Sequence, residues 1–269
     1  MTLTKSKRFS ALLFSLAMVV PVAVQATVVE VRTVLGNFEV NLFDETTPET
    51  VENFLSYANS GAYANNVVHR TQSNFVMQAG GFAYNNAFPP TSIQTGAAVI
   101  NEPVLSNVRG TIAMAKVNGN VNSATSQWFI NVNDNAANLD TQNGGFTVFG
   151  QVLGNGMEIV DAIINTPNFD FGGAFGTIPL RDFTDTDKAA GTTPNDTNLV
   201  IITDIVVINA DVVTNSDLTP AANTLLPADS DSVVDDDSSN DSGGSGGSMG
   251  ALLVWLIAGF AFRRRLQQA

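Results

Sequence analysis

The sequence contains no cysteine and a single histidine, His69. Without cysteine, the chain can form no disulfide bond, thiolate nucleophile or thiolate metal site. One imidazole cannot supply a second histidine ligand to a metal, and no nucleophile–base pair of a hydrolase can be assigned around it. We therefore expect His69 to have a packed or hydrogen-bonded structural role, and we expect no cofactor or metal.

Basic residues are also scarce, with 12 Lys and Arg against 25 Asp and Glu and a net charge of −13. Half of the basic residues lie in the two terminal segments, at Lys5, Lys7, Arg8 and Arg263 to Arg265. Removal of both segments would lower the net charge from −13 to −19. Such an acidic surface repels phosphate backbones, which excludes nucleic acid as a partner.

Residues 1–26 have the pattern of a secretory signal peptide. A basic start precedes the apolar run from Ala11 to Val20, and small residues at Val24 to Ala26 offer a cleavage site before Thr27. A buried N-terminal helix is the alternative, but the order of charge and apolarity, followed by Pro21, disfavours it. We expect signal peptidase to remove this segment and the protein to be exported.

The C-terminal part differs from the rest in composition. Residues 211–248 are rich in Asp, Ser, Asn and Gly, which predicts a flexible acidic linker. Residues 249–269 combine about fourteen uncharged residues, 249–262, with a basic end, and this run is shorter than the ~20 residues of a bilayer-spanning helix. The triple arginine would hold that end on the cytoplasmic side.

A Gly/Ser stretch, a short apolar run and a basic cluster, in this order, resemble the bacterial GlyGly-type C-terminal sorting signal. The resemblance implies inner-membrane contact through residues 249–262 and cleavage by a rhomboid-like protease. A permanent, slightly short membrane anchor is the alternative. The sequence does not decide between the periplasm and the cell surface.

Residues 27–210 have the pattern of one strand-rich domain. Apolar and polar residues alternate from Val29 to Thr33 and from Phe38 to Leu42, and the turn at Gly36-Asn37 between them predicts a hairpin. Further strands are expected at Val67–Thr71, Phe75–Ala79, Thr111–Val117, Gln127–Val132, Phe146–Val152 and Leu199–Ile208.

Two helices are expected beside these strands. The first begins at Thr47-Pro48 and ends near Gly61, and the second covers Met157–Asn165. Two helices on about eight strands predict a mainly β fold, a closed eight-stranded antiparallel barrel capped by two α-helices. Periodicity alone does not separate a barrel from a sandwich. Residues 168–198 are expected to form a surface loop, with a calcium-binding loop as the alternative.

Three segments combine aromatic and amide side chains with one arginine. The first runs from His69-Arg70 to Phe75-Val76-Met77-Gln78-Ala79-Gly80-Gly81, the second is Ser126-Gln127-Trp128-Phe129-Ile130, and the third holds Leu139-Asp140 and Phe146. In order and spacing these segments resemble the cyclophilin family of peptidyl-prolyl isomerases. The resemblance covers most of residues 28–208 and is strongest to exported bacterial members.

The resemblance implies a role for individual positions. Arg70 matches the catalytic arginine, and Gln78 matches the glutamine that hydrogen-bonds the substrate backbone and orients that arginine. The positions that match the proline pocket and the neighbouring groove are Phe75, Val76, Phe129, Leu139 and Phe146, and Ala115, Lys116 and Gln127, respectively. Lys116 is expected to contribute through its backbone, and Phe146 stands where many members carry histidine. Asn138 replaces a tryptophan that helps to bind cyclosporin, which implies weak inhibition by that drug.

The function implied is peptidyl-prolyl cis–trans isomerisation at Xaa-Pro bonds of exported proteins, which would assist their folding. Its partners would be proline-containing peptide segments, and we expect a monomer. A surface-displayed module that binds proline peptides without turnover is the alternative. The arginine favours the enzyme, because a pure binder would not need it.

Overall fold

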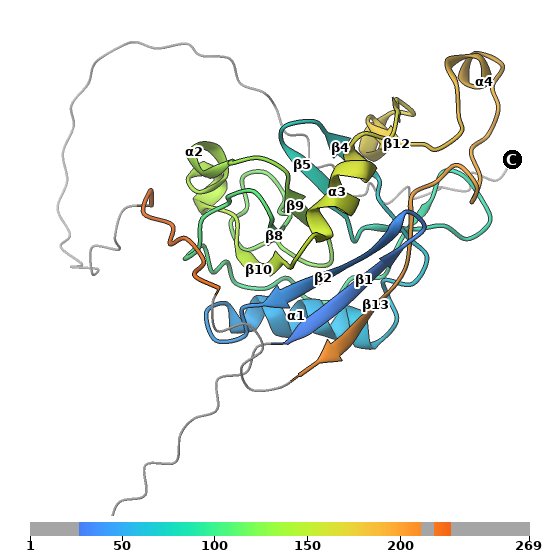
Figure 1. Ribbon diagram of the computed structural model, residues 1–269. Helices are drawn as coiled ribbons and strands as arrows, with labels where there is room; N and C mark the ends of the chain where they lie inside the picture. The colour runs from blue at the N-terminus through green and yellow to red at the C-terminus, as the bar shows by residue number, and fades with distance from the viewer. Residues whose placement is uncertain (1–26, 211–217, 227–269) are drawn as a thin grey trace, which may run out of the picture.

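The computed structural model describes residues 27–210 and 218–226 (Figure 1). The predicted signal peptide, residues 1–26, and the predicted sorting segment, residues 249–269, lie outside these ranges, as does most of the predicted linker. In the described part of the chain no helix combines the length and the apolar character needed to cross a membrane.

The domain is built around one strongly curled antiparallel sheet. The predicted hairpin is formed by β1 (Val28–Thr33) and β2 (Gly36–Leu42), and β13 (Ile201–Asn209) pairs with the other side of β1. Figure 1 shows these three strands side by side, with the last strand of the sheet in orange against the first two in blue. The other strands of this sheet are β3 (Asn66–Val67), β4 (Arg70–Gln72), β5 (Val76–Ala79), β6 (Phe82–Ala83), β7 (Thr91–Ser92), β8 (Thr111–Met114), β9 (Trp128–Asn131) and β10 (Val148–Val152).

The sheet order is β4-β5-β9-β8-β10-β2-β1-β13-β3-β6-β7. The segment that contains β3 and β4 closes it, because β3 pairs with β13 whereas β4 pairs with β5. Between β3 and β4, Val68 N donates to Val200 O and His69 N donates to Gln78 O. The segment is therefore bonded first to the β13 side and then to β5. With β3 and β4 taken as one strand, and the short β6 and β7 left aside, eight strands surround the core, which confirms the predicted mainly β, barrel-like architecture.

The two predicted helices are present as α1 (Pro48–Asn59) and α3 (Gly156–Ile164). Proline opens α1 because its fixed φ suits the first helical position, where no backbone donor is needed. Gly61 follows the helix with a φ of +73°, a conformation that glycine adopts without strain. Two shorter helices were not predicted, α2 (Ala136–Leu139) and α4 (Asp185–Ala189), nor were the 3₁₀ turns η1 (Gln142–Gly144) and η2 (Gly173–Phe175).

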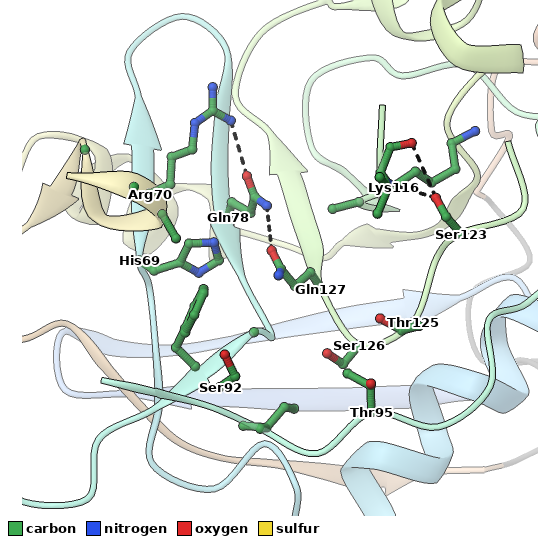
Figure 2. A pocket seen from close by; sticks show the side chains of 18 of the residues that line it. His69, Arg70, Gln78, Ser92, Thr95, Lys116, Ser123, Thr125, Ser126 and Gln127 are labelled. Carbon is green, nitrogen blue, oxygen red and sulfur yellow. Dashed lines mark hydrogen bonds between the residues drawn. The ribbon is translucent and has the colours of Figure 1, made fainter. Parts of the chain in front are cut away.

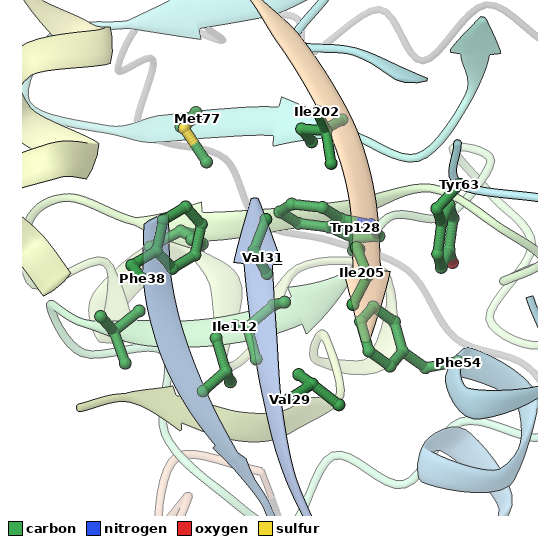
Figure 3. Packing of buried hydrophobic residues seen from close by; sticks show 14 of the residues in the cluster. Val29, Val31, Phe38, Phe54, Tyr63, Met77, Ile112, Trp128, Ile202 and Ile205 are labelled. Atoms are coloured by element: carbon green, nitrogen blue, oxygen red, sulfur yellow. The ribbon is translucent and has the colours of Figure 1, made fainter. Parts of the chain in front are cut away.

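The main core fills the space inside the sheet (Figure 3). Trp128 on β9 is fully buried, and the ring of Phe54 from α1 meets it edge-on at a centroid distance of 6.4 Å. Alternating residues along β1 and β2 point into the same core, which is what period-2 patterning predicts for a sheet with one buried face, and Ile202 and Ile205 of β13 join them. The strands that carry the site therefore pack with their other face against this core.

The structure of residues 168–198 differs from the surface loop that the sequence predicts. They do not form a plain surface loop: β11 (Asn168–Phe169) and β12 (Ile178–Pro179) pair, and a second apolar cluster lies beneath them. The cluster takes its side chains from this segment and from the barrel, among them Phe169, Leu180, Phe183, Val67 and Ile201. The described residues contain no group of three or more His, Asp or Glu side chains that could hold a metal ion, so they give no support to the calcium alternative.

Residues 218–226 correct a second expectation, that of a flexible linker throughout 211–248. This stretch packs on the domain: Ala222 forms an antiparallel bridge with Leu105, and Ser106 N donates to Ala221 O at 2.8 Å. Composition misses such a segment because its backbone and one amide side chain, Asn223, make its hydrogen bonds to the domain, and these need no apolar run.

Candidate active site

Arg70 opens β4, in the segment that closes the curled sheet. Its guanidinium donates to two glutamines, to Gln78 Oε1 at 3.3 Å and to Gln72 Oε1 at 2.6 Å, and it lies 5.9 Å from the centre of the Phe75 ring. Partial burial lowers the pKa of Arg70 from its ordinary value, and arginine remains charged at any physiological pH. The sheet therefore presents a fixed, partly desolvated cation.

Gln78 connects this arginine to the next strand. Arg70 and Gln78 are direct partners across β4 and β5, and Gln78 is nearly fully buried. Its amide nitrogen donates to Gln127 Oε1 at 2.9 Å, so a chain of three polar side chains crosses the sheet (Figure 2). The predicted residues Arg70, Gln78 and Gln127 are thus brought together.

The five predicted proline-pocket residues also come together. Val76, Phe129, Leu139 and Phe146 belong to one buried apolar cluster with Ala115, and Phe75 packs against it. The rings of Phe129 and Phe146 meet edge-on at 5.8 Å. Aromatic edges and faces arranged in this way offer a close-fitting apolar wall to a small ring.

A cavity of about 610 Å³ lies beside this cluster and not on it. It is lined by the other half of the predicted set, Arg70, Gln78, Ala115, Lys116 and Gln127. The apolar cluster and the polar groove therefore adjoin one another along the row of amides, and an extended peptide could lie across both.

The side chain of Lys116 makes contacts beyond the backbone role that the sequence predicts for this residue. Its ammonium is turned inward and donates to the carbonyl oxygens of Asn143 and Gly145, and it lies 4.9 Å from the centre of the Phe146 ring. Burial lowers its pKa to about 8. The charge of Lys116, and not its backbone alone, thus helps to hold the loop that presents Phe146.

His69 has the structural position that the sequence predicts. It is buried, and its ring packs edge-on against Phe82 at 4.9 Å. Burial lowers its pKa to about 3, a backbone hydrogen bond with Val67 acts in the opposite direction, and the neighbouring Arg70 lowers it further. Neutral at physiological pH and enclosed, it is not suited to proton transfer at the groove.

Two contributors were missed by the sequence reasoning. Gln72 shares the face of β4 with Arg70, since residues two apart on a strand point the same way, and that spacing was a usable signal. Asn135 donates from its side-chain nitrogen to Phe75 O at 2.9 Å and to Asn131 Oδ1 at 2.7 Å. It fixes the backbone of a pocket residue from 60 positions away, and no local pattern signals this contact.

Comparison with known proteins agrees with this geometry. Residues 28–177 match the family model for cyclophilin type peptidyl-prolyl cis-trans isomerase. The chain belongs to this family. It is 41% identical over 153 residues to the peptidyl-prolyl cis-trans isomerase of Acinetobacter baylyi, covering 56% of this chain and 78% of that one. It is 39% identical over 163 residues to peptidyl-prolyl cis-trans isomerase A of Dickeya dadantii, covering 59% and 82%.

The protein is a peptidyl-prolyl cis–trans isomerase, and its substrates are proline-containing peptides. The reaction must overcome a rotation barrier of about 18–20 kcal/mol that arises from amide resonance. Resonance is lost when the bond twists, and the prolyl nitrogen then gains a lone pair that can accept a hydrogen bond. A guanidinium held by Gln72 and Gln78 can donate to that nitrogen, and this interaction is strongest at the twisted transition state.

The remaining residues of the site are placed where they could bind and orient the substrate. The apolar cluster of Phe75, Phe129, Leu139 and Phe146 can hold the proline ring while the preceding carbonyl rotates. Gln78 and Gln127, which are hydrogen-bonded to each other, line the neighbouring groove, where an extended peptide could lie. The step requires no proton transfer and no covalent intermediate, which is consistent with a buried, neutral His69.

Proposed function

We propose that this isomerase acts outside the cytoplasm, on Xaa-Pro bonds of exported proteins, and assists their folding in the periplasm or at the cell surface. The proposal rests on the signal-peptide pattern of residues 1–26 and on the sorting-signal pattern at the C-terminus. Uncatalysed prolyl isomerisation takes about 10–100 s, long enough to limit the folding of a newly exported chain.

One observation in the folded domain supports cleavage after Ala26. Thr27 N donates to Asp44 Oδ2 at 2.9 Å, and its hydroxyl donates to Asp44 Oδ1 at 2.7 Å. Cleavage at this point would turn the Thr27 amide into an ammonium that already faces a carboxylate. A charged donor makes a stronger bond to a carboxylate than a neutral one does.

The export proposal is tested by fusing residues 1–26 to alkaline phosphatase, which becomes active only where its disulfides can form. We expect phosphatase activity, and we expect the mature full-length chain from the same host to begin at Thr27. The matched control is Leu16→Arg, which places a charge in the apolar run. An inactive fusion, or a mature chain that still carries residues 1–26, would refute the proposal.

The C-terminal proposal needs a host that contains a rhomboid-like sorting protease. We expect mass spectrometry of the chain recovered from the cell surface to show that the apolar segment 249–262 has been removed. Replacement of Arg263 to Arg265 by glutamine should reduce that processing. A chain that keeps the segment and stays in the membrane fraction would favour the permanent anchor.

The client proposal is tested on a disulfide-free exported protein whose slow refolding phase is limited by a native cis-proline. Catalytic amounts of this isomerase should shorten that phase, and Arg70→Ala should not. Equal acceleration by both forms would show that the effect is not isomerisation.

A further inference from the structure

We propose that residues 218–226, the clamp segment, hold one wall of the proline pocket in place, and that Asn223 is the positioning residue through which they act. The wall in question is residues 139–146, the pocket loop, which carries Leu139 at its start and Phe146 at its end. In Figure 1 the clamp segment is the red-orange stretch on the side of the molecule that bears α2.

The clamp segment is attached first to residues 103–106. Asn223 N donates to Val104 O at 2.9 Å, and Ser106 N donates to Ala221 O at 2.8 Å. These two bonds flank the antiparallel bridge between Ala222 and Leu105. Leu105 is itself part of the apolar cluster of the proline pocket, so this attachment already lies directly behind the site.

The side chain of Asn223 then joins this segment to the pocket loop. Its amide nitrogen donates to Asp140 O and to Pro103 O, both at 3.0 Å. Its amide oxygen accepts from Leu225 N at 2.9 Å, which fixes the orientation of the amide. The side chain of Asn223 therefore connects the pocket loop, residues 103–106 and the clamp segment itself.

The pocket loop needs such external support. Asn143 has a φ of +52°, and Gly144 and Gly145 each have a φ of +73°. Glycine adopts this conformation without strain but loses the most conformational freedom when it is ordered, so contacts from outside the turn are needed to fix it. Phe146 N donates to Leu139 O at 2.9 Å, so displacement of either end of the loop displaces both pocket residues.

Apolar packing adds to the hydrogen bonds. A Cβ placed on Gly145 would lie 3.2 Å from Leu226 Cδ1 and 2.8 Å from Pro103 Cβ, so the clamp segment covers the loop closely at that point. The carboxylate of Asp140 is buried and accepts from Asn107 N at 2.7 Å and from the Asn107 amide at 2.9 Å. Asp140 is therefore fixed at two points: Asn107 binds its carboxylate, and Asn223 binds its backbone carbonyl oxygen.

The test uses the full chain with Asn223→Asp, which keeps the size of the side chain but replaces the donor by an acceptor facing two carbonyl oxygens. KM and kcat are measured with a short Xaa-Pro peptide. The wall binds the proline ring in both the ground state and the transition state, so its loosening should raise KM with little change in kcat. Loss of two hydrogen bonds predicts a KM about five- to tenfold higher.

Hydrogen exchange of the Gly145 and Phe146 amides supplies a second readout. Both amides are bonded within the pocket loop, and both should exchange faster in the variant. Thr224→Ala is the matched control, since Thr224 is an exposed neighbour in the same segment, and it should change neither KM nor exchange. Asn223→Ala is measured in parallel, because it removes the donor without adding a charge.

A folded Asn223→Ala or Asn223→Asp protein with unchanged KM and unchanged exchange at these amides overturns the proposal. A lower thermal midpoint with unchanged KM overturns it as well, because that result describes a purely structural segment. If Asn223→Asp does not fold, the result for Asn223→Ala decides.

Discussion

At the residue scale, the site depends on the two hydrogen bonds that hold the guanidinium of Arg70. Two glutamine oxygens accept from its guanidinium, one from the same strand and one from the partner strand. Lysine could supply the charge but not a planar group that bonds two acceptors and still directs a donor at substrate. The identity of this side chain is therefore expected to matter more than its charge.

Arg70→Ala should lower kcat/KM for an Xaa-Pro peptide by about 10²–10³, the usual effect of removing one donor that acts on a developing charge. Arg70→Lys should recover only a small part of this. A protease-coupled peptide assay gives both values, and circular dichroism shows whether the variants are folded. An Arg70→Lys enzyme with nearly full activity would show that charge alone suffices.

His69 makes stability depend on pH in a defined direction. Its folded pKa of about 3 lies below the ordinary value near 6.5, so the unfolded chain takes up the proton first as pH falls. The free energy of unfolding should be greatest above pH 6.5 and should fall between pH 6.5 and 5 by up to about 1.4 kcal/mol per pH unit.

This slope can be assigned because the chain has no other histidine. Urea unfolding of wild type and His69→Phe at several pH values measures it, and phenylalanine suits the site because Nδ1 of His69 has no partner in the described structure. The slope above pH 5 should disappear in the variant. Equal slopes in both proteins would mean that another group is responsible.

Lys116 gives the pocket a second pH dependence. Above its pKa of about 8 the ammonium loses its charge, and its attraction to the Phe146 ring is lost while its bonds to the Asn143 and Gly145 carbonyls weaken. KM should rise about three- to tenfold between pH 7 and 9, the range that a cation–π contact of this kind predicts. Lys116→Met should have a raised KM at pH 7 and no further rise, whereas parallel pH profiles would contradict this role.

At the scale of elements, the site is the product of strand pairing. Gln78 on β5 pairs with Arg70 on β4 and with Phe129 on β9, so the register of two strand pairs places the Arg70 guanidinium beside the apolar cluster. Gly80 ends this arrangement just after β5, with a φ of +86° and a donor bond of 2.7 Å to Asn66 Oδ1.

Gly80→Ala should therefore be strongly destabilising. A Cβ there would lie 2.4 Å from Ser126 O and 2.7 Å from Trp128 Cδ1, and the positive φ adds backbone strain. We expect a loss of about 3 kcal/mol or more in urea unfolding. Gly61→Ala is the control, because it has a φ of +73° but open space around it, and it should lose only about 1 kcal/mol. Equal losses would mean that the clash at Gly80 is relieved by movement.

At the scale of the whole molecule, the residue that follows the proposed cleavage site is bound to the folded domain. The amide and the hydroxyl of Thr27 both donate to the carboxylate of Asp44. Thr27 O in turn accepts from Leu42 N at 2.8 Å. Thr27 is thus bound to the sheet through β2.

Asp44→Asn should cost a chain that starts at Thr27 about 1 kcal/mol more than it costs the full chain. Only in the shorter chain is the donor an ammonium, and a partly exposed ion pair is worth about that much. Urea unfolding of the four proteins gives the difference. Equal losses in the two backgrounds would show that the ammonium makes no special use of Asp44.

The sequence by itself determined the family, the two main helices and most strands of the main sheet, and it predicted the site residues that the fold brings together. Alternation along β1 and β2, the Thr47-Pro48 start of α1 and the run from Arg70 to Gln78 are local patterns, and short-range stereochemistry makes such patterns legible.

The tertiary structure alone decided which distant groups meet. It brings Gln127 to Gln78 across 49 positions, turns the Lys116 ammonium inward to the pocket loop, packs residues 168–198 into a second core and lays Asn223 on Asp140 across 83 positions. The polar contacts depend on single side chains, which bond an amide or a backbone carbonyl, and the second core joins apolar residues of this segment to apolar residues of the barrel strands. Their partners are chosen by the closure of the sheet, and a local pattern carries no information about that closure.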